Sequence, residues 1–192
     1  MFLNRNTNGM KIIVGVSGAS GIVLARRLLQ ILKEKNIDRH LIVSGAAREI
    51  AKHELGGLDL GRLASRSYDE KDFSAAISSG SFKMDGMVII PCSMRTLGGI
   101  ANGIAHNLIV RAAEVMLKQD KKLVLVPREA PLDLIHLRNM VACREAGCVI
   151  IPPVLAFYPK PESVTDMVDF VVGKVLDSLG IENSLYKRWG EE

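Results

Sequence analysis

The segment KIIVGVSGASGIVLARRLL, residues 11–29, decides the fold. Its first part, residues 12–16, is an almost uniformly apolar run rich in β-branched residues, which predicts a strand buried on both faces of a parallel sheet. From Ile22 onward, apolar residues recur every three or four positions, the period of a helix with one buried face. Only small residues, Gly18-Ala19-Ser20-Gly21, lie between the two patterns. The segment therefore predicts a strand, a tight turn and a helix.

The glycines of this turn favour an anion site. Gly15, Gly18 and Gly21 let the backbone approach a ligand closely, and the amides that open the helix offer donors and partial positive charge to a phosphate. The spacing G-x-x-G-x-x-G differs from the dinucleotide pattern G-x-G-x-x-G, and Ser44 stands where NAD-binding proteins carry an acid. A mononucleotide therefore fits better than NAD. A tight strand-to-helix turn without a ligand explains the same residues, so both interpretations stay open here.

The composition is that of one folded domain. The 192 residues are 48% hydrophobic and 24% charged, which is enough for a substantial core. Residues 1–9 lack the apolar core of a signal peptide, so we expect a flexible extension at 1–9 and a single domain at 10–192. Three cysteines, an odd number, argue against a disulfide framework and favour a cytoplasmic location.

Charge and hydropathy exclude two classes of partner. The net charge of +4 is dispersed along the chain and only 5% of the residues are aromatic, which disfavours nucleic acid. No apolar run approaches the roughly 18 residues of a membrane span, so we expect no membrane partner. The sequence holds no HExxH or DDxxD pattern, and we expect no metal.

The rest of the chain alternates strands and helices. Buried strands are predicted at residues 40–44, 86–91, 123–127 and 148–151, with a short edge strand near residues 66–67. Helices are predicted at residues 46–55, 97–105, 107–118, 132–146 and 163–179, and another, capped by Asp69 or Asp72, through residues 75–77. This alternation predicts one three-layer α/β/α domain with a mostly parallel sheet.

Two polar segments follow predicted strands directly. Residues 92–96, CSMRT, come after one buried strand, and residues 128–131, REAP, come after the next. We expect the first of these to be a loop. Ligands of open α/β sheets bind at the carboxyl ends of the strands, so both segments are candidates for a binding site.

Several separate motifs resemble the flavin prenyltransferase family, the UbiX/Pad1 group, over essentially the whole chain. They are GVSGASG at 15–21, ISSGSF at 77–82, PCSMRTLGGIANG at 91–103, RAAEVMLK at 111–118, LVLVPREAPL at 123–132, PPVLAFY at 152–158 and RWGE at 188–191. The resemblance implies a Rossmann-like sheet of six strands in the order 3-2-1-4-5-6, bound FMN and a cytoplasmic homododecamer. It also implies a reaction in which dimethylallyl monophosphate alkylates reduced FMN at N5 and C6. The prenylated FMN would serve a UbiD-type decarboxylase, in ubiquinone biosynthesis or in aromatic acid decarboxylation.

The resemblance also implies the flavin site. The family positions that contact FMN fall on Gly18, Ala19, Ser20, Ser44, Ser93, Met94, Arg95, Thr96 and Arg128. Ser20 is carried over as a catalytic hydroxyl near the flavin N5. A helix N-cap is an equally good explanation of this serine, and the two roles are compatible.

A second group of family positions surrounds the phosphate of the prenyl donor. It comprises Arg111, Lys118, Arg128, Tyr158 and Lys174, some supplied across a subunit interface. Cations and a phenol suit a departing phosphate. The resemblance assigns proton transfer to Glu54 and Glu129. From sequence alone, Lys118 and Lys174 are more typical of a solvated helix surface, and only their place in the family motifs reverses that interpretation. An ion pair with Arg128 explains Glu129 equally well, and an exposed helix end explains Glu54 equally well.

Three other functions are weighed against prenyl transfer. FMN-dependent cysteine decarboxylases carry an asparagine where this chain has Arg95, and a histidine that is missing between residues 54 and 85. A non-catalytic FMN-carrying subunit of a decarboxylase complex would not need the cationic group. No residue distinguishes decarboxylation of an aromatic acid by this chain itself from supply of the cofactor to a decarboxylase.

Trp189 and Tyr186, near the C-terminus, either cover the pocket or pack on the core.

Overall fold

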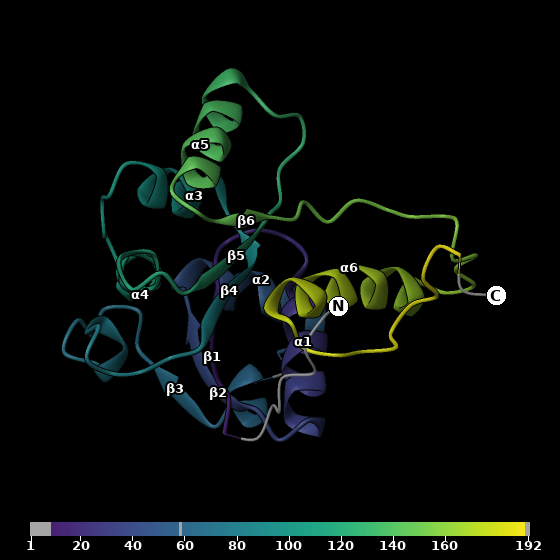
Figure 1. The fold of residues 1–192 in the computed structure, drawn as a ribbon, viewed down its shortest axis with the longest axis horizontal. Coiled ribbons are helices and arrows are strands. Elements are labelled where there is room, and N and C mark those ends of the chain that lie inside the picture. Colours follow the sequence, from purple (N-terminus) through teal and green to yellow (C-terminus); the bar gives the residue numbers. More distant parts are fainter. Residues whose placement is uncertain (1–8, 58, 191–192) are drawn as a thin grey trace.

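In the computed structural model, which describes residues 9–57 and 59–190, the six predicted strands form one parallel sheet in the order β3-β2-β1-β4-β5-β6 (Figure 1). The strands are β1 Lys11–Val16, β2 Asp38–Val43, β3 Arg66–Tyr68, β4 Gly86–Cys92, β5 Lys122–Pro127 and β6 Val149–Ile150. The helices are α1 Ile22–Glu34, α2 Gly45–Leu55, α3 Met94–Ala101, α4 Leu108–Lys118, α5 Leu134–Glu145 and α6 Val164–Leu179. The predicted strand order is confirmed. The predicted extension at residues 1–9 lies, except for Gly9, outside the described residues.

Helices cover both faces of the sheet. Alternate residues of β1 point to opposite sides, so that Ile12 and Val14 pack under α1 and α6, whereas Ile13 packs with α3 and α4 on the other face. The same alternation runs through β4 and β5. Both faces of the central strands are therefore buried, which is why their sequences read as continuous apolar runs.

Two helix predictions are wrong in extent. Residues 75–77 give only a 3₁₀ turn, η2 Ala76–Ser78, because Asp69 and Asp72 accept hydrogen bonds from amides two residues ahead, forming local turns instead of a helix cap. The helix predicted at 97–105 begins at Met94, so Met94, Arg95 and Thr96 form its first turn and are not a loop. A second 3₁₀ turn, η1 Leu60–Leu63, follows α2.

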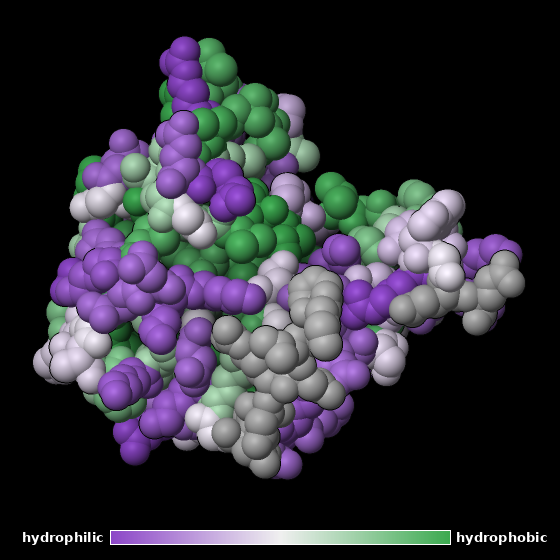
Figure 2. Space-filling model, in the orientation of Figure 1, coloured by the Kyte–Doolittle hydropathy of each residue, from purple (hydrophilic) through white to green (hydrophobic). Residues whose placement is uncertain are grey.

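Helix α5 stands out from the body of the domain on α3 (Figure 1), and only Cys143 of its residues is buried. Leu134, Ile135 and Val141 are exposed, Ile135 by 66%, and Figure 2 shows hydrophobic residues gathered on this part of the surface. Residues 151–163, which follow β6, run out to the start of α6 and expose further apolar side chains, among them Val154, Leu155 and Phe157. An apolar surface of this kind is typical of a protein–protein interface.

Candidate active site at the carboxyl edge of the sheet

Ser17 ties together the ends of the two central strands. Its hydroxyl donates to the carbonyl of Pro91 at 3.0 Å and accepts from the amide of Ser93 at 2.7 Å, and the residue is only 1% exposed. These bonds fix the turn after β1 against the start of α3. Sequence reasoning missed Ser17, because a serine that ends a strand gives no periodic signal.

The turn after β1 requires its glycines. A Cβ atom on Gly18 would lie 2.6 Å from the Cβ of Ala46, so this position lets the start of α2 approach the turn. Gly21 has φ +104°, a left-handed conformation, and is the N-cap of α1 without a side-chain cap. Ser20 is exposed and does not cap the helix, so the N-cap interpretation of Ser20 is wrong.

Glu54 occupies the N-terminus of α1. Its carboxylate accepts from the amide of Gly21 at 3.0 Å and from the amide of Ile22 at 2.8 Å. A carboxylate is favourable there because of the partial positive charge at a helix N-terminus. The amides expected to hold a phosphate are thus already bonded to Glu54. This side chain is more than an exposed helix end, although it does remain solvent-accessible.

Two serines open the neighbouring helices. The hydroxyl of Ser44 accepts from the amide of Ala47 at 3.1 Å and caps α2, and that of Ser93 accepts from the amide of Thr96 at 3.3 Å and caps α3. The N-terminus of α3 carries no such carboxylate among the hydrogen bonds of the described residues. Its first-turn amides at Met94 and Arg95 are therefore the open donors on this edge.

Glu70 is a second residue that sequence reasoning missed. Its carboxylate accepts from the amide of Gly45 at 2.6 Å and from the side chain of Asn107 at 3.3 Å. Its own carbonyl accepts from the amide of Leu108 at 2.7 Å. Glu70 therefore joins the N-termini of α2 and α4 beside Ser44, from an irregular stretch without hydrophobic periodicity.

The loop after β5 brings Arg128 and Glu129 to the same edge. The Arg128 amide donates to the carbonyl of Cys92 at 3.0 Å, which anchors the loop beside β4. Glu129 accepts from the amide of Ala130 at 3.0 Å. Within the part of the chain that the structure describes, Arg128 and Glu129 form no ion pair, so the expected alternative pairing is absent, and the Arg128 side chain is exposed.

Arg111 lies in the first turn of α4, near the carboxyl edge, whereas Lys118 ends that helix. The Arg111 guanidinium donates to the carbonyl of Ser78 and to the carboxylate of Glu114, both at 3.2 Å. Lys118 is the last residue of α4 and lies only four residues before the first residue of β5. It therefore lies toward the amino edge of the sheet, opposite to the other predicted site residues, and its side chain is exposed.

Tyr158 and Lys174 form a third group beside α6, with Tyr158 before the helix and Lys174 on it. The Tyr158 ring contacts those of Phe170 at 5.9 Å and Trp189 at 5.4 Å between centroids. The Lys174 ammonium lies 5.7 Å from the centre of the Tyr186 ring. Figure 1 shows the start of α6 directed away from the sheet. One chain thus presents its predicted site residues in separate places.

The described residues form neither a metal-binding cluster nor a membrane-spanning helix. In residues 9–57 and 59–190, no group of three or more His, Cys, Asp and Glu side chains is placed to bind a metal ion. No helix in the same ranges is both long and apolar enough to cross a lipid bilayer. The three cysteines, Cys92, Cys143 and Cys148, are free thiols and buried.

Comparison with known proteins gives consistent matches over nearly the whole chain. The family profile described as Flavoprotein matches residues 2–176. A protein of Methanocaldococcus jannaschii named flavin prenyltransferase UbiX is 49% identical over 183 residues, which is 94% of this chain and 99% of that protein.

Two solved structures are similar in both fold and sequence. A dodecameric FMN-dependent UbiX-like decarboxylase from Escherichia coli O157:H7 has a TM-score of 0.89 and 48% identity, covering 94% of this chain and 99% of its own. A UbiX protein in complex with FMN and dimethylallyl pyrophosphate has a TM-score of 0.91 and 41% identity, covering 95% of this chain and 98% of its own.

Proposed function

This chain belongs to the flavoprotein family and, within it, to the UbiX/Pad1 flavin prenyltransferases, and from this premise we propose that it prenylates reduced FMN. The donor would be dimethylallyl monophosphate. The bond between its allylic carbon and the phosphate oxygen would break as a carbon–nitrogen bond forms at N5, and the N5 proton would leave with the phosphate. Protonation of the remaining alkene would then allow a carbon–carbon bond to C6, with loss of the C6 proton. The observation that carries the proposal is the full-length match to named prenyltransferases, combined with a carboxyl edge rich in hydrogen-bond donors that could bind a phosphate.

The side chains at this edge suit FMN. Ser44 and Ser93 supply hydroxyls, the first turn of α3 supplies open amides, and Arg128 supplies an exposed cation for an anionic group. Gly18 and Ala19 present no bulky side chain to a flat ring. FMN, when bound, supplies the two nucleophilic positions that accept the prenyl group. Met94, Arg95 and Thr96 would complete the flavin contacts from α3.

Ser20, Glu54 and Glu129 would donate and accept protons during the reaction. Glu54 is fixed on the amides of residues 21 and 22, which follow Ser20 in the sequence, and this supports pairing the two in proton transfer. Glu129 lies on the loop that also carries Arg128. General acid–base groups of this type contribute most when they are held within hydrogen-bond reach of the proton they move.

Arg111, Lys118, Arg128, Tyr158 and Lys174 would bind the donor phosphate. In the described residues, the side chains of Lys118, Arg128 and Lys174 form no ion pair, so their charges are available to a ligand. Cations aimed at a leaving phosphate stabilise the charge that develops in the transition state. We assign this role without a metal.

The residues that would bind the donor phosphate come together only in an oligomer. Lys118 and Tyr158 lie far from Arg128 along the fold, on different elements, and α5 and residues 151–163 expose apolar side chains that an interface would bury. The similar structure from Escherichia coli O157:H7 is dodecameric. We therefore assign a homododecamer to this chain, in which neighbouring copies complete each donor site.

The first test is the mass of the flavin recovered after anaerobic incubation of the protein with reduced FMN and dimethylallyl monophosphate. We expect a flavin heavier by one C5 unit, and dimethylallyl diphosphate run in parallel identifies the preferred donor. Lys118→Ala is the matched negative control, since it should retain FMN. Unmodified flavin from the wild-type protein would overturn the proposal.

The decarboxylase alternative has one specific observation in its favour, the name of the similar structure from Escherichia coli O157:H7. Release of CO₂ from aromatic acids or from a cysteine peptide, without any added decarboxylase, would support direct decarboxylation. Activation of a UbiD-type apo-decarboxylase by the reaction product would instead support that enzyme as recipient. We also propose a cytoplasmic location, which the three free thiols support.

A further inference from the structure

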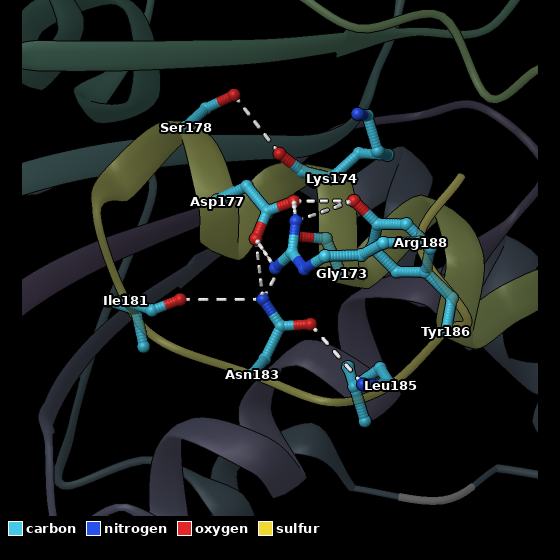
Figure 3. A network of polar contacts seen from close by, with 9 residues as sticks. All are labelled: Gly173, Lys174, Asp177, Ser178, Ile181, Asn183, Leu185, Tyr186 and Arg188. Atoms are coloured by element: carbon cyan, nitrogen blue, oxygen red, sulfur yellow. Dashed lines mark hydrogen bonds and ion pairs between the residues drawn. The ribbon is translucent and has the colours of Figure 1, made fainter. Parts of the chain in front are cut away.

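The C-terminal segment, residues 183–188, is fastened to α6 by one carboxylate. Figure 3 shows Asp177 receiving hydrogen bonds from Arg188 at 2.7 and 3.0 Å, from the Tyr186 hydroxyl at 2.6 Å and from the Asn183 amide at 2.9 Å. The Asp177 side chain is 24% exposed. Although burial opposes it, these hydrogen bonds from Arg188 and Tyr186 hold the pKa of Asp177 below its ordinary value. Charge-assisted, two-pronged contacts of this kind fix geometry as well as adding energy.

Gly173 provides a second, independent sign that this contact is built into the helix. A Cβ atom at Gly173 would lie 2.5 Å from Cδ1 of Tyr186 and 3.0 Å from Oδ1 of Asn183. Glycine is unfavourable relative to alanine inside a helix. Here it gives Tyr186 a seat directly on the α6 backbone. The Asn183 side chain also donates to the Gly173 carbonyl at 3.3 Å.

The fastened segment delivers aromatic rings to two residues of the donor site. Tyr186 lies under the Lys174 ammonium and packs edge-on against Phe170 at 5.0 Å between centroids. Trp189 packs edge-on against Tyr158 at 5.4 Å while remaining 82% exposed. Tyr158 also packs against Phe170 of α6, and the tail adds the Trp189 ring to that contact. The tail also adds the Tyr186 ring beside the Lys174 ammonium, so these rings further restrict both side chains.

We propose that Gly173, Asp177 and Arg188 are positioning residues for the prenyl donor: they clamp residues 183–188 so that Tyr186 and Trp189 order Lys174 and Tyr158. This inference rests on the proposed function for its substrate. The clamp acts on an allylic phosphate, with the ammonium and phenol facing the phosphate and the rings offering π faces to a cationic allyl group. It does not touch the flavin contacts at the carboxyl edge.

The test compares Asp177→Asn and Gly173→Ala with Asp169→Asn in the full-length oligomer. Asp169 is the matched control because it lies on the same helix and forms a comparable two-pronged pair with Arg27, at 2.6 and 3.0 Å, away from the tail. Gly173→Ala favours the helix backbone, while its Cβ would meet the Tyr186 ring. Urea unfolding of all three variants separates a displaced tail from a folding defect. We expect the KM for dimethylallyl monophosphate to rise about tenfold in both clamp variants and to stay within twofold in the control, with FMN affinity unchanged in all three.

Trp189 is the only tryptophan in the sequence, so its fluorescence anisotropy reports on the tail without any turnover. In apo-protein we expect lower anisotropy in Asp177→Asn and Gly173→Ala than in the wild type and the control. Unchanged anisotropy would overturn the clamp, and lowered anisotropy with an unchanged donor KM would overturn its role in positioning. If the wild-type protein transfers no prenyl group, the proposed function fails, and donor binding measured by calorimetry still decides whether the clamp orders a phosphate site.

Discussion

Replacement of Ser17 by alanine should destabilise the domain and loosen the flavin site together. The substitution removes a hydroxyl that is buried between β1 and β4 and that makes two hydrogen bonds. The Pro91 carbonyl keeps one donor, because the Ser17 amide also bonds to it at 3.2 Å. The Ser93 amide keeps none. One net hydrogen bond is worth about 1 kcal/mol and an unsatisfied amide costs about 1–3 kcal/mol, so we expect a loss of about 2–4 kcal/mol.

Urea unfolding at a fixed subunit concentration measures this loss. Ser79→Ala is the control, because the Ser79 hydroxyl bonds to the Ser81 hydroxyl at 2.9 Å on the surface, where substitutions change stability by less than about 0.5 kcal/mol. We also expect weaker FMN binding by Ser17→Ala, because the Ser17 hydroxyl holds the amide of Ser93, the N-cap residue of α3. If Ser17→Ala and Ser79→Ala unfold at the same urea concentration, the hydroxyl does not join the strand ends as argued.

Three further predictions follow from the structure. Burial holds the pKa of His40 below its ordinary 6.5, so on acidification the unfolded chain takes up a proton before the folded chain does. The free energy of unfolding measured in urea should therefore be constant above pH 6.5 and fall below it. A His40→Gln variant whose stability falls just as steeply with pH would contradict this. Lys118→Ala and Tyr158→Phe should each weaken donor use while FMN stays bound, and co-assembled mixtures of the two variants should regain activity in turnover assays; mixtures no better than the separate variants would argue against shared sites. Ile135→Asp on α5 should lower the mass found by light scattering, and an unchanged mass would place the interface elsewhere.

The fold was largely predictable because its strands are unusual in composition. Runs such as residues 12–16 are apolar on both faces and end at glycine, serine or proline, which leaves little choice but a buried parallel strand. The predictions for residues 75–77 and 92–96 were wrong because the structure there depends on single side-chain hydrogen bonds. At Asp72 such a bond stopped a helix, and at Ser93 it started one.

The site was predictable only in part. Strand ends located Ser44, Ser93 and Arg128, since parallel strands deliver their carboxyl ends to one edge. The position of Lys118 depends on where α4 ends, and that of Tyr158 on the path of residues 151–163. Neither can be predicted from the types of the residues. Asp177 and Arg188 are paired across eleven residues, without a repeating pattern that connects them.

Under the proposed shared donor site, the apolar surface of α5 would make activity depend on dilution. An isolated chain would leave Ile135 and its neighbours in water and, on that proposal, would hold only part of a donor site. By mass action, the fraction of complete sites then depends on subunit concentration, so specific activity should fall below a threshold concentration instead of staying constant. Newly made chains would accordingly pass through a lag in which they are folded but inactive, with a length set by the rate at which subunits meet.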